Sequence, residues 1–340
     1  MQEFWKDRKV LITGGAGFIG SNLAARLVSL GSRVRVADGL ERGRLLNLQT
    51  ILGQIESPKL DLRDPVACDK ACEGQEVVFH LASKVGGINY YLQQPAEVMT
   101  QNLLLDINVW KAAESAGAQF YFYASSAHVY PKELQASPAS PLLREEDAYP
   151  ANPELSYGWA KLMGEKMIEY HLRQGSPLRA AIVRLIGVYG PHQDIDLATG
   201  SAIPVFTRRA IEYPGRQPFT VLGSGDETRS YCYIEDVLDA MLLAVEKLDV
   251  HQLIGPLNIG SEERIRIGDL ARMIINISGK KIPITYDRSH QTVIWGQALD
   301  CSKAERLLDG WRPRVPLVQG LRCSYEHISH HLARTESTLS

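Results

Sequence analysis

Short, mainly apolar runs alternate with amphipathic stretches along the first half of the chain. Such runs, bounded by glycine or polar residues, are typical of strands buried in a parallel sheet. We expect these strands at residues 10–13, 34–37, 77–81, 120–123 and 181–185. Apolar residues at helical spacing separate them and predict helices at residues 21–28, 102–116 and 157–172. The alternation predicts an α/β fold built on a doubly wound parallel sheet of the Rossmann type.

A glycine-rich turn follows the first expected strand. Gly14, Gly17 and Gly20 stand between that strand and the first helix, and a second strand ends at Asp38. Glycines let the backbone approach a pyrophosphate closely, and the helix N-terminus offers amide donors and a favourable dipole. The sequence of strand, glycine turn, helix, strand and acid therefore predicts a dinucleotide-binding site.

Asp38 is placed to accept both hydroxyls of an adenosine ribose. A carboxylate there repels a 2′-phosphate, which favours NAD over NADP. Arg42 and Arg44 lie close behind Asp38 in the sequence, and an arginine could hold that phosphate. We therefore expect a preference for NAD, and the two arginines keep NADP as the alternative.

The pattern changes after residue 190, where prolines and glycines separate shorter segments. Residues 229–236 are predicted to form a strand that runs into a helix, and residues 256–260 to form another strand. We expect residues 1–185 to form the NAD-binding Rossmann domain, with return segments near residues 230–260. Residues 186–334 would form a smaller, interleaved substrate-binding subdomain. The Pro-, Ser- and Glu-rich residues 131–153 predict a surface loop that could act as a lid.

Tyr157 and Lys161 are four residues apart and would share one face of a helix. Asn152 and Pro153 are expected to be the N-cap and first residue of that helix. A free phenol has a pKa of about 10, and a neighbouring ammonium group lowers it. The pair therefore predicts a proton-transfer group that works near neutral pH.

Composition excludes several other classes of protein. The formal net charge is −2, which gives no indication of a nucleic-acid-binding surface. The five cysteines show no metal-ligand spacing, and Cys68 and Cys72 are expected to be buried thiols. We expect no metal, no signal peptide and no membrane span, and hence a cytoplasmic protein. His80, within an apolar strand, is expected to be a core histidine.

Further stretches of the chain resemble one known family. They are residues 13–20, 61–64, 80–83, 124–130 and 229–231, together with Tyr157 and Lys161. In this order they resemble the extended short-chain dehydrogenase/reductase family, in the branch that acts on nucleotide sugars. Residues 84–88 and 129–131 look most similar to GDP-mannose 3,5-epimerase and GDP-fucose synthase. The resemblance implies NAD as the cofactor and a nucleotide-diphosphate sugar as the substrate.

The resemblance also implies roles for single residues. Tyr157 would take a proton from a sugar hydroxyl, and Ser126 would hydrogen-bond the same oxygen. Lys161 would lower the pKa of Tyr157 and hold the nicotinamide ribose, and Arg229 would pair with a substrate phosphate. Further implied contacts are with the cofactor for Gly14, Gly17, Phe18, Ile19, Gly20, Asp38, Asp61, Leu62 and Ala82, and with the substrate for Lys84, Gly86, Ser126 and His128.

The chain departs from these relatives at two expected acid/base positions. The 3,5-epimerising relatives carry a cysteine where this chain has His128, and the 4,6-dehydratases carry a glutamate there. The same relatives use a lysine or histidine where this chain aligns Ser201. Because histidine titrates near neutrality, His128 either transfers a proton or only hydrogen-bonds the substrate. We expect it to take part in chemistry next to a transient ketone.

The first hypothesis is an NAD-dependent nucleotide-sugar epimerase that works through a transient ketosugar, with a GDP-sugar favoured by the resemblance. The alternatives are a nucleotide-sugar 4,6-dehydratase or 4-keto reductase and, in a different class, a non-catalytic NAD(H)-binding regulator. The helices expected at residues 102–116 and 157–172 often form a dimer interface in this family, so the resemblance also implies a homodimer.

Overall fold

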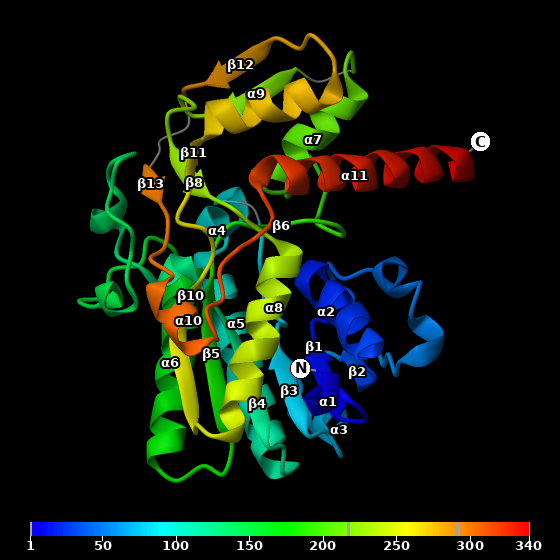
Figure 1. The fold of residues 1–340 in the computed structure, drawn as a ribbon, viewed down its shortest axis with the longest axis vertical. Coiled ribbons are helices and arrows are strands. Elements are labelled where there is room, and N and C mark those ends of the chain that lie inside the picture. The colour runs from blue at the N-terminus through cyan, green and yellow to red at the C-terminus, as the bar shows by residue number, and fades with distance from the viewer. Residues whose placement is uncertain (1, 87, 216–217, 290–292, 340) are drawn as a thin grey trace.

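The sheet at the centre of the molecule has six strands, all parallel. The computed structural model describes residues 2–86, 88–215, 218–289 and 293–339. The strand order is β10-β5-β4-β3-β1-β2 (Figure 1). The strands are β1 (Lys9–Thr13), β2 (Arg33–Ala37), β3 (Val77–His80), β4 (Phe120–Ser126), β5 (Arg179–Leu185) and β10 (Leu253–Ile259). The predicted doubly wound α/β fold is confirmed.

Helices cover both faces of this sheet. On one face lie α3 (Pro65–Cys72), α5 (Pro95–Ser115) and α6 (Ser156–Arg173), and on the other lie α2 (Phe18–Ser29) and α8 (Ile234–Glu246). Successive strand residues point to opposite faces. Leu11 and Val78 accordingly pack toward α3 and α5, whereas Ile12 and Phe79 pack into the core on the opposite face. Because both faces are buried, the strands are nearly continuous apolar runs.

The chain reverses direction across the sheet between β1 and β3. From β1 it runs outward to β2, and it then crosses back to β3 on the other side of β1. A crevice for ligands forms at the carboxyl ends of the two strands that flank such a switch. The turns there lie very close together, since a Cβ on Gly14 would stand 2.8 Å from the backbone nitrogen of Ala82.

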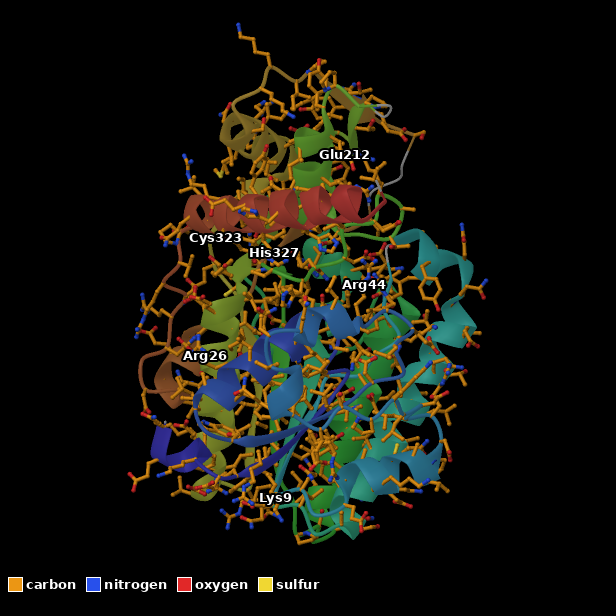
Figure 2. The ribbon with its side chains drawn as sticks, turned by 90° about the vertical axis from the view of Figure 1, so that its right-hand side faces the viewer. Lys9, Arg26, Arg44, Glu212, Cys323 and His327 are labelled. Carbon is orange, nitrogen blue, oxygen red and sulfur yellow. The ribbon has the colours of Figure 1, made fainter. Side chains whose placement is uncertain are left out.

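A smaller lobe lies over the carboxyl edge of the sheet (Figure 1). Its elements are α7 (Ala202–Glu212), α9 (Ile267–Ser278), the pair β7 (Phe219–Leu222) and β12 (Ile284–Asp287), and the three-stranded sheet of β11 (Arg264–Arg266), β8 (Thr228–Ser230) and β13 (Gly296–Gln297). The C-terminal helix α11 (Leu317–Leu339) crosses beside it and carries Cys323 and His327, while Lys9 lies at the opposite end of the molecule (Figure 2).

The two lobes interleave along the chain. Strand β10 and helix α8 lie with the main sheet although the chain has already entered the smaller lobe. The remaining α-helices and strands are α1 (Gln2–Trp5), α4 (Ile88–Gln93), α10 (Ser302–Leu307), β6 (Val188–Tyr189) and β9 (Cys232–Tyr233). A division at residue 185 stays a prediction. Among the described helices, none has the length and apolar character needed to cross a membrane.

The predicted start of α6 is wrong. The helix begins at Ser156, with Leu155 as the N-cap. Pro153 instead pairs with Pro131 in an isolated β-bridge, and the Asn152 side chain donates a 2.5 Å hydrogen bond to Glu133. These tertiary contacts hold residues 152 and 153 in an extended segment, which overrides their local preference for a helix N-terminus.

The predicted lid is also wrong. Within residues 131–153, all of which are described, Gln135, Leu143 and Ala148 are buried. Leu143 forms a bridge with Leu299, and the Gln135 amide bonds with Gln297, both in the C-terminal part of the chain. This segment is therefore packed into the protein. None of its residues lines the large cavity described below.

Candidate active site

One cavity of about 2870 Å³ extends from the switch point of the sheet into the space below the smaller lobe. It is lined by every residue that the sequence analysis placed in the site, and these residues come from seven separate stretches of the chain. They are Gly14, Gly17, Phe18, Ile19, Gly20, Asp38, Asp61, Leu62, Ala82, Lys84, Gly86, Ser126, His128, Tyr157, Lys161 and Arg229. A single ligand pocket usually occupies about 300–1,000 Å³, so this cavity has room for two ligands.

The glycine turn leaves the N-terminus of α2 open to the cavity. Gly14 has a φ of +67°, a conformation that glycine adopts at little cost. A Cβ on Gly20 would lie 2.5 Å from the carbonyl oxygen of Gly14, so the turn has no room for a side chain there. The first helical amides, Phe18 to Gly20, have no partner within the helix and line the cavity. This arrangement fits a pyrophosphate.

Asp38 is fixed at the end of β2 by two backbone donors. The N–H of Ala16 donates to Oδ2 at 3.0 Å, and the N–H of Leu40 donates to Oδ1 at 2.7 Å. These bonds hold the carboxylate beside the glycine turn, where a dinucleotide would place its adenosine ribose. Asp38 therefore fits the position expected for a ribose-binding acid.

Asp61, Leu62 and Ala82 line the neighbouring part of the cavity. The Asp61 carboxylate is already paired with Arg63, whose Nη2 lies 2.6 Å from Oδ2, and this hydrogen bond lowers the pKa of Asp61. Leu62 is almost fully buried and Ala82 donates its backbone N–H to the Thr13 hydroxyl. Leu62 and Ala82 give this part of the cavity an apolar lining that suits an adenine ring, whereas the Asp61 side chain is engaged by Arg63.

Ser126, Tyr157 and Lys161 meet on the floor of the cavity. Ser126 ends β4, and its hydroxyl accepts a 3.2 Å hydrogen bond from the backbone of His128. Tyr157 and Lys161 occupy successive turns at the start of α6, with the Lys161 ammonium 6.0 Å from the Tyr157 ring centroid. The structure thus places the three predicted proton-transfer residues together.

The pKa of Tyr157 differs from the expectation. Burial raises it to about 12, while hydrogen bonds with Ser83 and Ser126 lower it by less. Lys161 does not lower it, because its ammonium lies 3.9 Å from the Asp106 carboxylate and over the ring of Tyr123. The sequence did not show that a buried acid on α5 would compete with Tyr157 for the lysine.

Asp106 belongs to a buried chain of hydrogen bonds. Its Oδ1 lies 2.9 Å from Nε2 of His80, and its Oδ2 accepts a 2.6 Å bond from the Tyr123 hydroxyl. The Thr13 oxygen accepts the N–H groups of Leu81 and Ala82, so its hydroxyl hydrogen is left for Nδ1 of His80.

This accounting assigns the tautomer of His80. Nδ1 accepts a hydrogen bond, so the proton is on Nε2 and is donated to Asp106. Burial lowers the pKa of His80, which agrees with a neutral ring. His80 is therefore the core histidine that the sequence predicted, with both ring nitrogens satisfied.

His128 stands beside Tyr157 and a residue that the sequence analysis missed, Tyr91. The Tyr91 ring stacks on Tyr157 at 5.3 Å between centroids, and the His128 ring meets Tyr157 edge-on at 5.6 Å. Burial and the nearby Arg229 guanidinium lower the pKa of His128 to about 4. The ring is thus neutral near pH 7, contrary to the expectation that it titrates there. Tyr91 follows the loop after β3. That position in the sequence could have identified it as a residue of the site.

The expected substrate-binding residues line the side of the cavity toward the smaller lobe. Arg229 donates to the carbonyl oxygens of Thr228 and Ile294, each at 2.8 Å, and burial lowers its pKa. Lys84 is paired with Glu41 at 2.5 Å. Ser201 is the N-cap residue of α7 but makes no side-chain capping bond; its hydroxyl accepts a 3.5 Å hydrogen bond from the Gln193 amide. Neither Arg229 nor Lys84 is free of protein partners, and each would exchange a contact on binding a phosphate.

The described residues hold no group of three or more His, Cys, Asp or Glu side chains that could bind a metal ion. The fold and the cavity fit an enzyme that moves a hydride between a dinucleotide and a carbinol carbon of its substrate, while a proton moves at the hydroxyl. The part of the cavity at the switch point fits the dinucleotide, and Ser126, Tyr157 and Lys161 line the same cavity.

The chain belongs to the NAD dependent epimerase/dehydratase family, whose model matches residues 10–260. It is 30% identical to GDP-mannose 3,5-epimerase of Arabidopsis thaliana over 99% of this chain and 86% of that protein. It is 28% identical to UDP-glucuronic acid decarboxylase 1 of Xenopus tropicalis over 96% of this chain and 74% of that protein.

Solved structures show the same architecture. UDP-glucose 4-epimerase of Thermotoga maritima with UDP-glucose superposes with a TM-score of 0.84 and 27% identity, covering 95% of this chain and 99% of that one. The predicted resemblance is therefore confirmed, and the protein is an NAD-dependent enzyme of the extended short-chain dehydrogenase/reductase family.

Proposed function

We propose that the protein inverts one carbinol carbon of a nucleotide-diphosphate sugar through a transient ketone. The observation that carries this is the convergence of Ser126, Tyr157 and Lys161 on the floor of a cavity that also contains the dinucleotide groove. NAD, when bound, supplies the hydride acceptor and later the hydride donor. Because the cofactor is regenerated within each cycle, no second redox substrate is needed.

Three side chains of the protein carry the proton movements in this proposal. Tyr157 accepts the proton of the sugar hydroxyl as the ketone forms and returns it when the ketone is reduced. Ser126 holds the same oxygen, since its hydroxyl already bonds with Tyr157. Lys161 is proposed to hold the nicotinamide ribose, and to favour the phenolate only where its charge is turned from Asp106 toward the phenol.

His128 is proposed to bind the sugar. A base that removes a carbon-bound proton needs a pKa near the working pH, whereas the pKa of His128 is about 4. Its neutral ring can still donate and accept hydrogen bonds. Ser201 is also a poor acid or base without a helper, and Gln193 supplies only an amide. These two residues favour simple redox inversion over 3,5-epimerisation or dehydration.

The nucleotide end of the substrate is proposed to lie below the smaller lobe, with Arg229 on its phosphates. The similar proteins are named for GDP-mannose, UDP-glucuronic acid and UDP-glucose. The similarity to GDP-mannose 3,5-epimerase supports a GDP-sugar, as the sequence analysis expected. The screen described next is designed to identify the sugar.

The test is a screen of UDP- and GDP-sugars for epimer formation, with Tyr157→Phe as the matched variant. We expect one sugar to equilibrate with its epimer, and we expect the variant to lose about 10²–10⁴-fold in turnover while it retains NAD. A product lacking water would establish the dehydratase alternative. NAD binding without conversion of any sugar would favour the non-catalytic regulator.

We also propose a homodimer formed through the outer faces of α5 and α6. Large apolar side chains are exposed there, namely Leu104, Ile107, Trp159, Met163 and Tyr170. Light scattering after size exclusion should give twice the chain mass, and Met163→Glu should give monomers. A monomeric wild-type protein would contradict this proposal. The cytoplasmic location stays a prediction from the sequence.

A further inference from the structure

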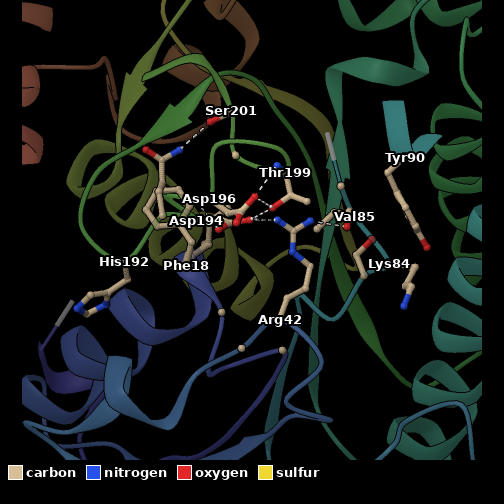
Figure 3. Close-up of a pocket in the computed structure, with 18 of the residues that line it drawn as sticks. Phe18, Arg42, Lys84, Val85, Tyr90, His192, Asp194, Asp196, Thr199 and Ser201 are labelled. Carbon is tan, nitrogen blue, oxygen red and sulfur yellow. Dashed lines mark hydrogen bonds and ion pairs between the residues drawn. The ribbon is translucent and has the colours of Figure 1, made fainter. Parts of the chain in front are cut away.

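The guanidinium of Arg42 joins three loops that meet above the dinucleotide groove. Arg42 lies in the loop after β2; its Nη1 donates to the carbonyl oxygen of Val85, after β3, at 2.5 Å. Its Nη2 donates to Oδ2 of Asp194, after β6, also at 2.5 Å. Figure 3 shows Arg42 between these two partners, and all three residues line the cavity.

The Asp194 carboxylate is held in place by its own loop. Its Oδ2 accepts a 2.7 Å hydrogen bond from the Thr199 hydroxyl, and its Oδ1 accepts the backbone N–H of Asp196 at 3.0 Å. Asp194 is therefore oriented toward the groove by contacts that do not involve Arg42 (Figure 3).

Stability does not explain this ion pair. The side chains of Arg42 and Asp194 are 38% and 28% exposed. Ion pairs of such exposure typically contribute only about 0–1 kcal/mol. The pair's position across a ligand groove is its distinctive feature.

The backbone beside Arg42 also lies against the acid proposed to bind the ribose. A Cβ on Gly43 would stand 2.7 Å from Oδ2 of Asp38. Arg42 and Arg44 leave the backbone on either side of Gly43. A released Arg42 side chain could therefore reach a phosphate on the 2′-oxygen of the adenosine ribose, a group that guanidinium binds well. Asp194 and Val85 direct it elsewhere.

We propose that Asp194 determines cofactor selectivity through Arg42. The Arg42–Asp194 pair forms a strap over the adenosine ribose that slows the release of NAD, and it withholds from NADP the guanidinium that would accept its extra phosphate. This inference rests on the proposed placement of the ribose at Asp38, and it does not depend on which sugar is the substrate. It makes Asp194 a positioning residue that acts through Arg42.

The test measures cofactor binding on the holoprotein. Exchange of bound NAD for isotopically labelled NAD gives the release rate, and competition with NADP gives the selectivity, both read by mass spectrometry. The variants are Asp194→Asn, Arg42→Gln and the double variant. Asp239→Asn is the matched control, because it breaks a similarly exposed ion pair, with Arg26, whose members do not line the cavity.

We expect Asp194→Asn to release NAD roughly tenfold faster and to bind NADP roughly tenfold more tightly, the equivalent of one charge-assisted contact. Arg42→Gln should release NAD as fast but gain no affinity for NADP, and the double variant should behave like Arg42→Gln. Asp239→Asn should match the wild type.

Two results would overturn the proposal. One is an unchanged NAD release rate and NADP affinity in Asp194→Asn. The other is an equal gain of NADP affinity in Asp194→Asn and in the double variant, because that gain would not come from Arg42. Neither measurement uses a sugar. The proposal about the Arg42–Asp194 pair can therefore be refuted while sugar conversion is observed. It can also be supported while no sugar is converted.

Discussion

The phenol of Tyr157 needs help to lose its proton, because burial raises its pKa to about 12. Lys161 is the cation in reach, yet Asp106 shares its charge. The spacing of Tyr157 and Lys161 was enough to predict the pair from the sequence. Asp106 was not predictable in the same way, since it comes to Lys161 only when α5 and α6 pack together.

The charge of Asp106 raises the pKa of both Tyr157 and Lys161, which gives a test at the scale of one residue. Its charge raises the pKa of Lys161 against the lowering caused by burial. In Asp106→Asn, buried Lys161 loses its counter-charge, so its pKa should fall further. The alkaline limb of the pH–rate profile should then move to lower pH.

The control for this change is Tyr123→Phe, which removes a hydrogen bond to Asp106 but leaves its charge. We expect its alkaline limb to stay near that of the wild type. An unmoved alkaline limb in Asp106→Asn, with activity reduced only in proportion to folded protein, would show that Asp106 has a structural role alone.

His128 gives a pH-dependent contribution to stability. Its pKa in the folded protein is about 4, below the value of 6.5 for a free histidine. Between these values the unfolded chain binds a proton that the folded protein does not, so stability falls as the pH drops from about 6.5 to about 4. We expect the melting temperature of His128→Asn to depend less on pH in this window. Equal slopes for variant and wild type would refute the assigned pKa.

At the scale of elements, the turn between β1 and α2 is the part of the site that leaves least space for a side chain. Strand, turn and helix were all predictable, because their chemistry is local to residues 10–29. The start of α6 was not, since Asn152 and Pro153 are held by contacts with residues 131–133. A helix-start signal in the sequence cannot report such distant partners.

The turn itself can be tested by adding one methyl group. In Gly20→Ala the new Cβ would lie 2.5 Å from the Gly14 carbonyl oxygen, so the turn must open. We expect NAD affinity, measured by calorimetry, to fall by at least roughly tenfold. Gly53→Ala is the control, because nothing lies within 4 Å of its Cβ and affinity should not change. Retained affinity in Gly20→Ala would show that the pyrophosphate does not rest on this turn.

At the scale of the whole molecule, the site forms where the two lobes meet. The larger lobe supplies the glycine turn, Asp38, Ser126 and the α6 pair of Tyr157 and Lys161, and the smaller lobe contributes Arg229. The fold class and these residues were predictable because each motif carries its own chemistry. The Arg42–Asp194 contact spans 152 positions and has no local signature, so only the folded chain reveals it.

The central claim is that hydride leaves one sugar carbon and returns to the same carbon on its other face. The most direct measurement uses the substrate found in the screen, carrying deuterium at the carbon that inverts, with the product analysed by NMR and mass spectrometry. A parallel reaction uses unlabelled substrate in deuterated water. The account predicts an epimer that keeps its deuterium in the first reaction and gains no carbon-bound deuterium in the second. Loss of the label, or solvent deuterium at a neighbouring carbon, would contradict it.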